Sequence, residues 1–116
     1  MTKIRFKTGC MLKDLKPQTV IALMLCRQIY KENFIAEMVV TSVNDGKHMA
    51  RSKHYTGEAF DLRTKSTGRS TQIASEARRV LGPLGFDVVF EAAGEINEHL
   101  HVEWDPKFAE ILTEEV

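Results

Sequence analysis

The residues best suited to chemistry in this chain are histidines and carboxylates in two short segments. The first segment, SKHYTGEAFD, contains His54 and ends at Asp61, and the second, EHLHVEW, begins at Glu98 and contains His99 and His101. Imidazole nitrogens and carboxylate oxygens are preferred zinc ligands, and a catalytic zinc site typically has three protein ligands and an open position for water. Alternation along a strand places His99 and His101 on one face, about 7 Å apart. The two segments therefore predict a hydrolytic zinc site.

The same segments contain a candidate for proton transfer. A His, Asp, His ligand set leaves the zinc site with a charge of about +1, which lowers the pKa of bound water towards about 7 and polarises a carbonyl group. Peptide hydrolysis also needs a carboxylate that takes a proton from the water and passes it to the leaving amine. Glu98, at the start of the second segment, is placed for that role. Strand geometry alone makes both His99 and His101 ligands.

Each of these residues also has an ordinary structural interpretation. An H-x-H motif on a strand is nonspecific, and a lone histidine such as His54 in a polar loop is usually a surface residue. Glu98 and Glu95 are by themselves loop carboxylates. Asp61 is harder to explain in this way, because it lies among apolar strand residues and a buried carboxylate needs partners. The prediction depends on the conjunction of the two segments.

Together, the pattern S-x-H-x-x-G-x-A-x-D at 52–61 and the pattern E-x-x-H at 98–101 resemble the two signature segments of a zinc peptidase family. That family includes D-alanyl-D-alanine carboxypeptidases, vancomycin-resistance dipeptidases and phage L-alanyl-D-glutamate endolysins, and it shares its metal-site fold with the hedgehog signalling domain. The resemblance spans about residues 39–104, with both motifs in the family's order. It implies a zinc metallopeptidase that hydrolyses peptidoglycan stem peptides, at a D-Ala-D-Ala or an L-Ala-D-Glu bond, with one zinc ion per chain.

Carried over residue by residue, the resemblance implies that His54, Asp61 and His101 bind zinc and that Glu98 is the general base. His99 then lines the site as a catalytic residue that contacts the substrate or the oxyanion. Glu98 can face the metal only if the regular strand starts after it, because alternation would otherwise turn its side chain away from His101. Glu95 is the reserve candidate for the base.

One departure from the family bears on activity. Many relatives carry an oxyanion-stabilising arginine shortly after a Ser-Gly-Tyr stretch, whereas residues 42–45 here are Ser-Val-Asn-Asp. Lys47, Arg51 or His99 would have to supply that charge, and Lys47, Arg51 and Ser52 are the candidates for substrate binding. The missing arginine leaves open an alternative, a zinc-stabilised binding module of the same fold that has lost catalysis. A small structural protein with polar histidines at its strand ends is the third interpretation.

Hydrophobic periodicity and turn signals predict the elements that would position these residues. Strands are expected near residues 4–7, 37–42, 59–64, 86–91 and 99–104, and helices near 17–32, from Ser70 or Thr71 to Leu81, and from Pro106. The core face of the first helix is expected to contain Val20, Ile21, Met24, Leu25, Gln28 and Ile29. The last two strands are joined only by a loop, which favours an α+β fold with a small antiparallel sheet packed against two or three helices.

Composition limits the alternatives. A chain of 116 residues is expected to form one domain, 1–116, and its 16 basic and 16 acidic side chains give no net charge. Binding to nucleic acid or to a membrane surface is not expected without a basic excess. Neither a spanning helix nor a signal peptide is evident, so we expect cytoplasmic synthesis without a membrane anchor. Release to the wall during phage lysis and a bacterial peptidase of the cytoplasm are the two alternatives. The expected partners are peptidoglycan peptides or other D-amino-acid peptides.

Overall fold

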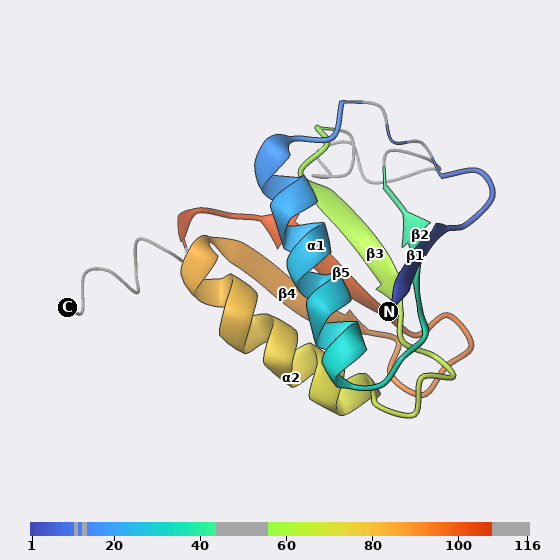
Figure 1. Ribbon diagram of the computed structural model, residues 1–116. Helices are drawn as coiled ribbons and strands as arrows, with labels where there is room; N and C mark the ends of the chain where they lie inside the picture. Colours follow the sequence, from blue (N-terminus) through green and yellow to red (C-terminus); the bar gives the residue numbers. More distant parts are fainter. Residues whose placement is uncertain (11, 13, 44–55, 108–116) are drawn as a thin grey trace.

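The computed structural model describes residues 1–10, 12, 14–43 and 56–107. In these residues, two helices cover one face of a five-stranded sheet (Figure 1). The strands are β1 (Lys3–Phe6), β2 (Glu37–Ser42), β3 (Ala59–Arg63), β4 (Phe86–Glu91) and β5 (His99–Trp104), and the helices are α1 (Pro17–Glu32) and α2 (Ser70–Leu81), followed by a 3₁₀ turn at Gly82–Leu84. The strand order β1-β2-β3-β5-β4 places β3 and β5 side by side. These two strands contain predicted metal ligands.

The predicted α+β class is confirmed, with one correction to the sheet. Three of the four strand pairings are antiparallel, but β1 runs parallel to β2, with Lys3 opposite Glu37. The connection between β1 and β2 passes through α1, and a helical crossover of this kind joins parallel strands. The sheet is therefore mixed, and the prediction of an antiparallel sheet was wrong at this edge. The helix predicted from Pro106 falls largely on residues 108–116, outside the described part of the chain.

Helix α1 begins at Pro17, whose missing N–H costs nothing in the first turn. The helix buries a face that differs from the predicted one except at Ile29: Ile21 is 59% exposed, and Val20 and Met24 are exposed as well. The residues that it buries are Thr19, Ala22, Leu23, Cys26, Ile29 and Tyr30. All of them except Thr19 belong to the hydrophobic core. Within the described residues, neither helix has the length and apolar character of a membrane span.

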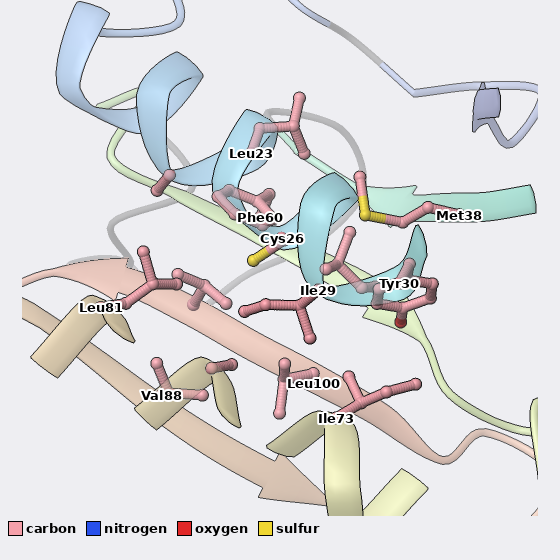
Figure 2. Close-up of a cluster of buried hydrophobic side chains, with 14 of the residues drawn as sticks. Leu23, Cys26, Ile29, Tyr30, Met38, Phe60, Ile73, Leu81, Val88 and Leu100 are labelled. Carbon is pink, nitrogen blue, oxygen red and sulfur yellow. The ribbon is translucent and has the colours of Figure 1, made fainter. Parts of the chain in front are cut away.

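The core fills the space between the helices and the sheet (Figure 2). From the central strands it takes alternate residues, Phe60 and Leu62 of β3 and Leu100 and Val102 of β5, each at most 1% exposed. Successive side chains of a strand point to opposite faces. The residues between them, Asp61 on β3 and His101 on β5, therefore project from the face that the helices leave uncovered.

The buried face of α1 can be tested with two variants that remove the same side chain from the same helix. Ile29 is 3% exposed and Ile21 is 59% exposed. We expect Ile29→Ala to lower the free energy of unfolding by about 2–5 kcal/mol, the usual cost of such a cavity, and Ile21→Ala to cost less than about 1 kcal/mol. Urea unfolding followed by circular dichroism measures both, and an equal loss in the two variants would contradict the observed packing.

Candidate metal centre

Asp61 and His101 face each other across β3 and β5. The strand register pairs their Cα atoms, and Asp61 Oδ1 lies 2.8 Å from His101 Nδ1 although the residues are 40 positions apart in the sequence. Their side chains are only 16% and 15% exposed. Strand pairing thus brings together two of the three residues predicted to bind zinc. The third, His54, lies outside the described residues.

A second carboxylate contacts the same imidazole from the other side. Glu103 follows His101 by two positions on β5, so both side chains lie on one face of the sheet. Glu103 Oε1 is 2.8 Å from His101 Nε2. His101 is therefore held between Asp61 and Glu103. Glu103 is not among the residues predicted from the sequence, although the period of two that groups His99 with His101 also reaches residue 103.

The two carboxylates determine the charge of His101. Burial disfavours the imidazolium and by itself lowers the pKa of His101, but the hydrogen bonds and negative charges of Asp61 and Glu103 outweigh burial and raise the pKa to about 9. Without a metal ion, His101 is therefore protonated at neutral pH and donates one N–H to each carboxylate. A metal ion that binds this imidazole has to displace one of the two protons.

The Asp61–His101 pair suits zinc in its donor atoms and its spacing. Tetrahedral zinc, with bonds of about 2.0–2.1 Å, keeps two ligand atoms about 3.3 Å apart, so the pair would have to open by only about 0.5 Å. Within the part of the chain that the structure describes, no group of three His, Cys, Asp or Glu side chains is arranged to hold a metal ion. Glu103 does not complete such a group with the pair, because it contacts the other nitrogen of the ring.

Glu98, the predicted general base, has other contacts. The regular strand begins at His99, after Glu98, as the predicted role requires. The Glu98 carboxylate nevertheless accepts hydrogen bonds from Thr64 Oγ1 at 2.8 Å, from the backbone N–H of Gly94 at 2.8 Å and from the hydroxyl of Ser70. Ser70 is the first residue of α2, so Glu98 is directed towards the N-terminus of that helix. It is 8% exposed.

These hydrogen bonds lower the pKa of Glu98 and connect its carboxylate to the first residue of α2. The bond from Ser70 has the largest effect, and together with those from Gly94 and Thr64 it lowers the pKa of Glu98 in spite of burial. A general base works best with a pKa near the working pH, so the contacts favour a structural role for Glu98. The N-cap residue of α2 is Arg69, which makes no side-chain cap hydrogen bond, and the hydroxyl of Ser70, the first helical residue, donates to Glu98. Glu98 as the base stays a prediction, and the reserve candidate Glu95 is exposed.

His99 shares the open face with His101 but has separate partners. Its Nδ1 lies 2.8 Å from the carbonyl oxygen of Asn97, and its Nε2 lies 3.8 Å from Glu91 Oε1 on β4. In the contacts described for the two histidines, the Asp61 carboxylate is a partner of His101 only. This separation favours the assignment implied by the family resemblance over the assignment of both histidines as ligands.

An open cavity of about 350 Å³ lies beside the far end of β3. Arg63 is two positions after Asp61 on β3, which places its Cα about 7 Å from that of Asp61 on the same face. The lining residues from the end of β3 onwards are basic or polar. Those that precede or belong to β2 include Phe34, which is 87% exposed. The lining residues are Phe34, Ile35, Ala36, Glu37, Val39, Arg63, Lys65, Ser66 and Thr67. The predicted substrate-binding residues, Lys47, Arg51 and Ser52, lie outside the described residues.

Comparison of the chain with models of protein families, with curated proteins and with solved structures returned no match. A functional assignment therefore depends on the two sequence segments and on the geometry of the residues that they contribute.

The structural role of Glu98 predicts a specific response to acid. Because its pKa is lower in the folded than in the unfolded chain, the ionised carboxylate stabilises the fold fully above the unfolded pKa, about 4.3, and this contribution is lost as the pH falls through the folded pKa. We expect Glu98→Gln to lower the free energy of unfolding at pH 7 by about 1–3 kcal/mol. The difference from the wild type should shrink as the pH falls below the unfolded pKa.

Urea unfolding at a series of pH values measures this difference. Glu95→Gln is the matched control, because it removes an exposed carboxylate from the same loop. A Glu98→Gln protein as stable as the wild type at pH 7 would show that the three hydrogen bonds contribute nothing to the fold.

Proposed function

We propose that this chain is a zinc-dependent peptidase that hydrolyses stem peptides of bacterial peptidoglycan. The observation that carries the proposal is the Asp61–His101 pair, in which residues from two separate motifs lie 2.8 Å apart. Both side chains are largely buried, and strand alternation places them on the sheet face opposite the core. A carboxylate and an imidazole removed from water in this way are costly unless they are paired or bind a metal ion. The family resemblance supplies the substrate class.

In this proposal, His54, Asp61 and His101 hold one zinc ion. Bound zinc supplies a Lewis acid that polarises the scissile carbonyl and lowers the pKa of a water molecule. Strands β3 and β5 are hydrogen-bonded along their length and fix the spacing of Asp61 and His101 before any ion arrives. Sites built on strands hold their geometry better than sites on loops. The hedgehog-like fold of this family belongs to the same proposal.

A carboxylate of the chain has to carry the proton from the attacking water to the leaving amine. The motif assigns this step to Glu98, which would first have to give up hydrogen bonds to Thr64, Ser70 and Gly94. Glu95 is exposed in the loop before β5, and Glu103 is already beside His101. Replacing each glutamate by glutamine separates the three, because glutamine keeps the shape of the side chain but cannot take up the proton.

The cavity beside Arg63 suits the anionic part of a stem peptide. Arg63 and Lys65 lie on its lining and can pair with a carboxylate group, while the exposed ring of Phe34 offers an apolar surface. A peptide that lies along β3 from this cavity would pass the Asp61–His101 pair about two residues further on. Lys47, Arg51, Ser52 and His99 remain the residues proposed from the sequence for substrate or oxyanion contacts.

A zinc-stabilised binding module without catalysis is the second candidate. The hydrogen bonds of Glu98 favour it, because they occupy the predicted base and lower its pKa. The missing family arginine favours it as well. The two candidates share the metal site and differ only in whether peptide bonds are broken.

The metal site predicts one zinc ion per chain. We expect Asp61→Ala and His101→Ala to lose most of the zinc that the wild type retains after gel filtration, as measured by elemental analysis, because each removes one ligand. Asp87→Ala is the control: Asp87 lies opposite Glu103 on β4, so this variant removes a carboxylate from the same region without removing a proposed ligand. Full zinc occupancy in both ligand variants would contradict the proposed site.

The enzyme and the binding module are separated by digestion of purified peptidoglycan, followed by mass spectrometry of the muropeptides. An enzyme releases D-alanine or cleaves between L-alanine and D-glutamate, and chelation of zinc stops the reaction. Among Glu98→Gln, Glu95→Gln and Glu103→Gln, the variant that lacks the base should lose about 10²–10⁴-fold in rate while keeping its zinc. Zinc binding without new products would favour the binding module.

A further inference from the structure

We infer that Glu103 is a positioning residue that makes His101 bind its metal ion through Nδ1. The inference rests on the proposed zinc site and adds to it the ligating nitrogen and the residue that selects it. It starts from the chain of contacts that runs from Asp61 through the imidazole of His101 to Glu103, with 2.8 Å at each step.

A neutral imidazole has one protonated and one bare nitrogen, and only the bare nitrogen can bind a metal ion. The nitrogen of His101 that faces the other proposed ligand, Asp61, is Nδ1. An ion shared by Asp61 and His101 must therefore meet Nδ1. The remaining proton then resides on Nε2, which is the atom beside Glu103 Oε1.

Glu103 is held where it can select this tautomer. It lies on β5, which pairs with β3 on one side and with β4 on the other, so its backbone is fixed from both sides. Its side chain is 28% exposed, which reduces the competition of water for its oxygens. A carboxylate that accepts the outer N–H of a metal-binding histidine orients the ring and makes the ligating nitrogen more basic.

The geometry argues against Glu103 as a further ligand of the same ion. The lone-pair directions of Nδ1 and Nε2 diverge from the ring, so a carboxylate hydrogen-bonded to Nε2 is turned away from an ion at Nδ1. His99 shows the contrast on the same strand: its Nδ1 contacts the carbonyl of Asn97, and Glu91 is 3.8 Å from its Nε2. Among the described contacts of β5, only His101 has a carboxylate oxygen 2.8 Å from each of its two ring nitrogens.

Zinc affinity provides the first test. We would titrate metal-free wild type, Glu103→Ala, Glu103→Gln and Glu91→Ala with zinc in competition with a chromophoric chelator. Glu103→Ala should bind zinc about 10–100-fold more weakly. Glu103→Gln should lose less, because its amide oxygen still accepts the Nε2 proton. Glu91→Ala is the matched control, since it removes the carboxylate beside His99, and its affinity should be unchanged. Wild-type affinity in both Glu103 variants would overturn the inference.

The tautomer of His101 provides a readout that a merely structural role of Glu103 would not change. Nitrogen–proton correlation spectra of the zinc-loaded wild type should show the proton on Nε2 and the metal on Nδ1. In Glu103→Ala, the Nε2 proton should exchange with water faster. A metal ion found on Nε2 would overturn the inference while leaving the proposed function intact.

Two further outcomes distinguish a failure of this inference from a failure of the proposed function. A wild-type chain that binds no zinc would overturn the proposed function together with this inference. If Glu103→Gln keeps zinc affinity and tautomer unchanged but loses hydrolysis, Glu103 is the general base, which overturns its assignment as a positioning residue and supports the peptidase. Thermal unfolding of the metal-free variants checks their folding. If Glu103→Ala does not fold, the tautomer spectrum of the zinc-loaded wild type carries the test, because a metal ion on Nε2 overturns the inference without any variant.

Discussion

The antiparallel pairing of β3 with β5 is the interaction on which both the core and the candidate site depend. Phe60 and Leu100 enter the core from these strands, while Asp61 and His101 meet on the opposite face. A slip of one residue in either strand would turn its charged residues into the core and its apolar residues out to water, at a large free-energy cost. Hydrophobic burial on one face therefore holds the spacing of the polar pair on the other.

Much of the fold could be predicted from local patterns, because turns and periodicity determine where elements begin and end. Strands β4 and β5 have the predicted bounds, since a loop rich in small and polar residues separates them. The parallel pairing of β1 with β2 could not be predicted, because it joins segments separated by a whole helix. The buried face of α1 was predicted wrongly, except at Ile29, because apolar side chains lie on two of its faces and only tertiary packing decides which of them enters the core.

The same limit applies to the candidate site: contacts made by pairing of the two strands could be predicted, and contacts with other segments could not. Asp61 and His101 belong to motifs on strands, and pairing of those strands was enough to bring them together. The surroundings of Glu98 depend on Thr64 and Ser70, which come from other parts of the chain, so spacing within its own motif carried no information about them. Alternation predicts that Glu103 shares a face with His101, but nothing in the sequence indicates that this glutamate, among the acidic residues of the chain, contacts the imidazole.

The buried carboxylate of Glu98 also separates the loop that precedes β5 into two parts with different tolerance to change. At its end, Glu98 fastens the chain to Thr64 and to the start of α2, whereas residues 93–97 before it are exposed. A new side chain at Ile96, which is 93% exposed, would be accommodated in solvent, because the contacts of Glu98 keep β5 in place behind it. This loop leads directly into the strand of His101. Protein engineering therefore has, in the loop before this strand, a position whose side chain can change while the fold stays the same.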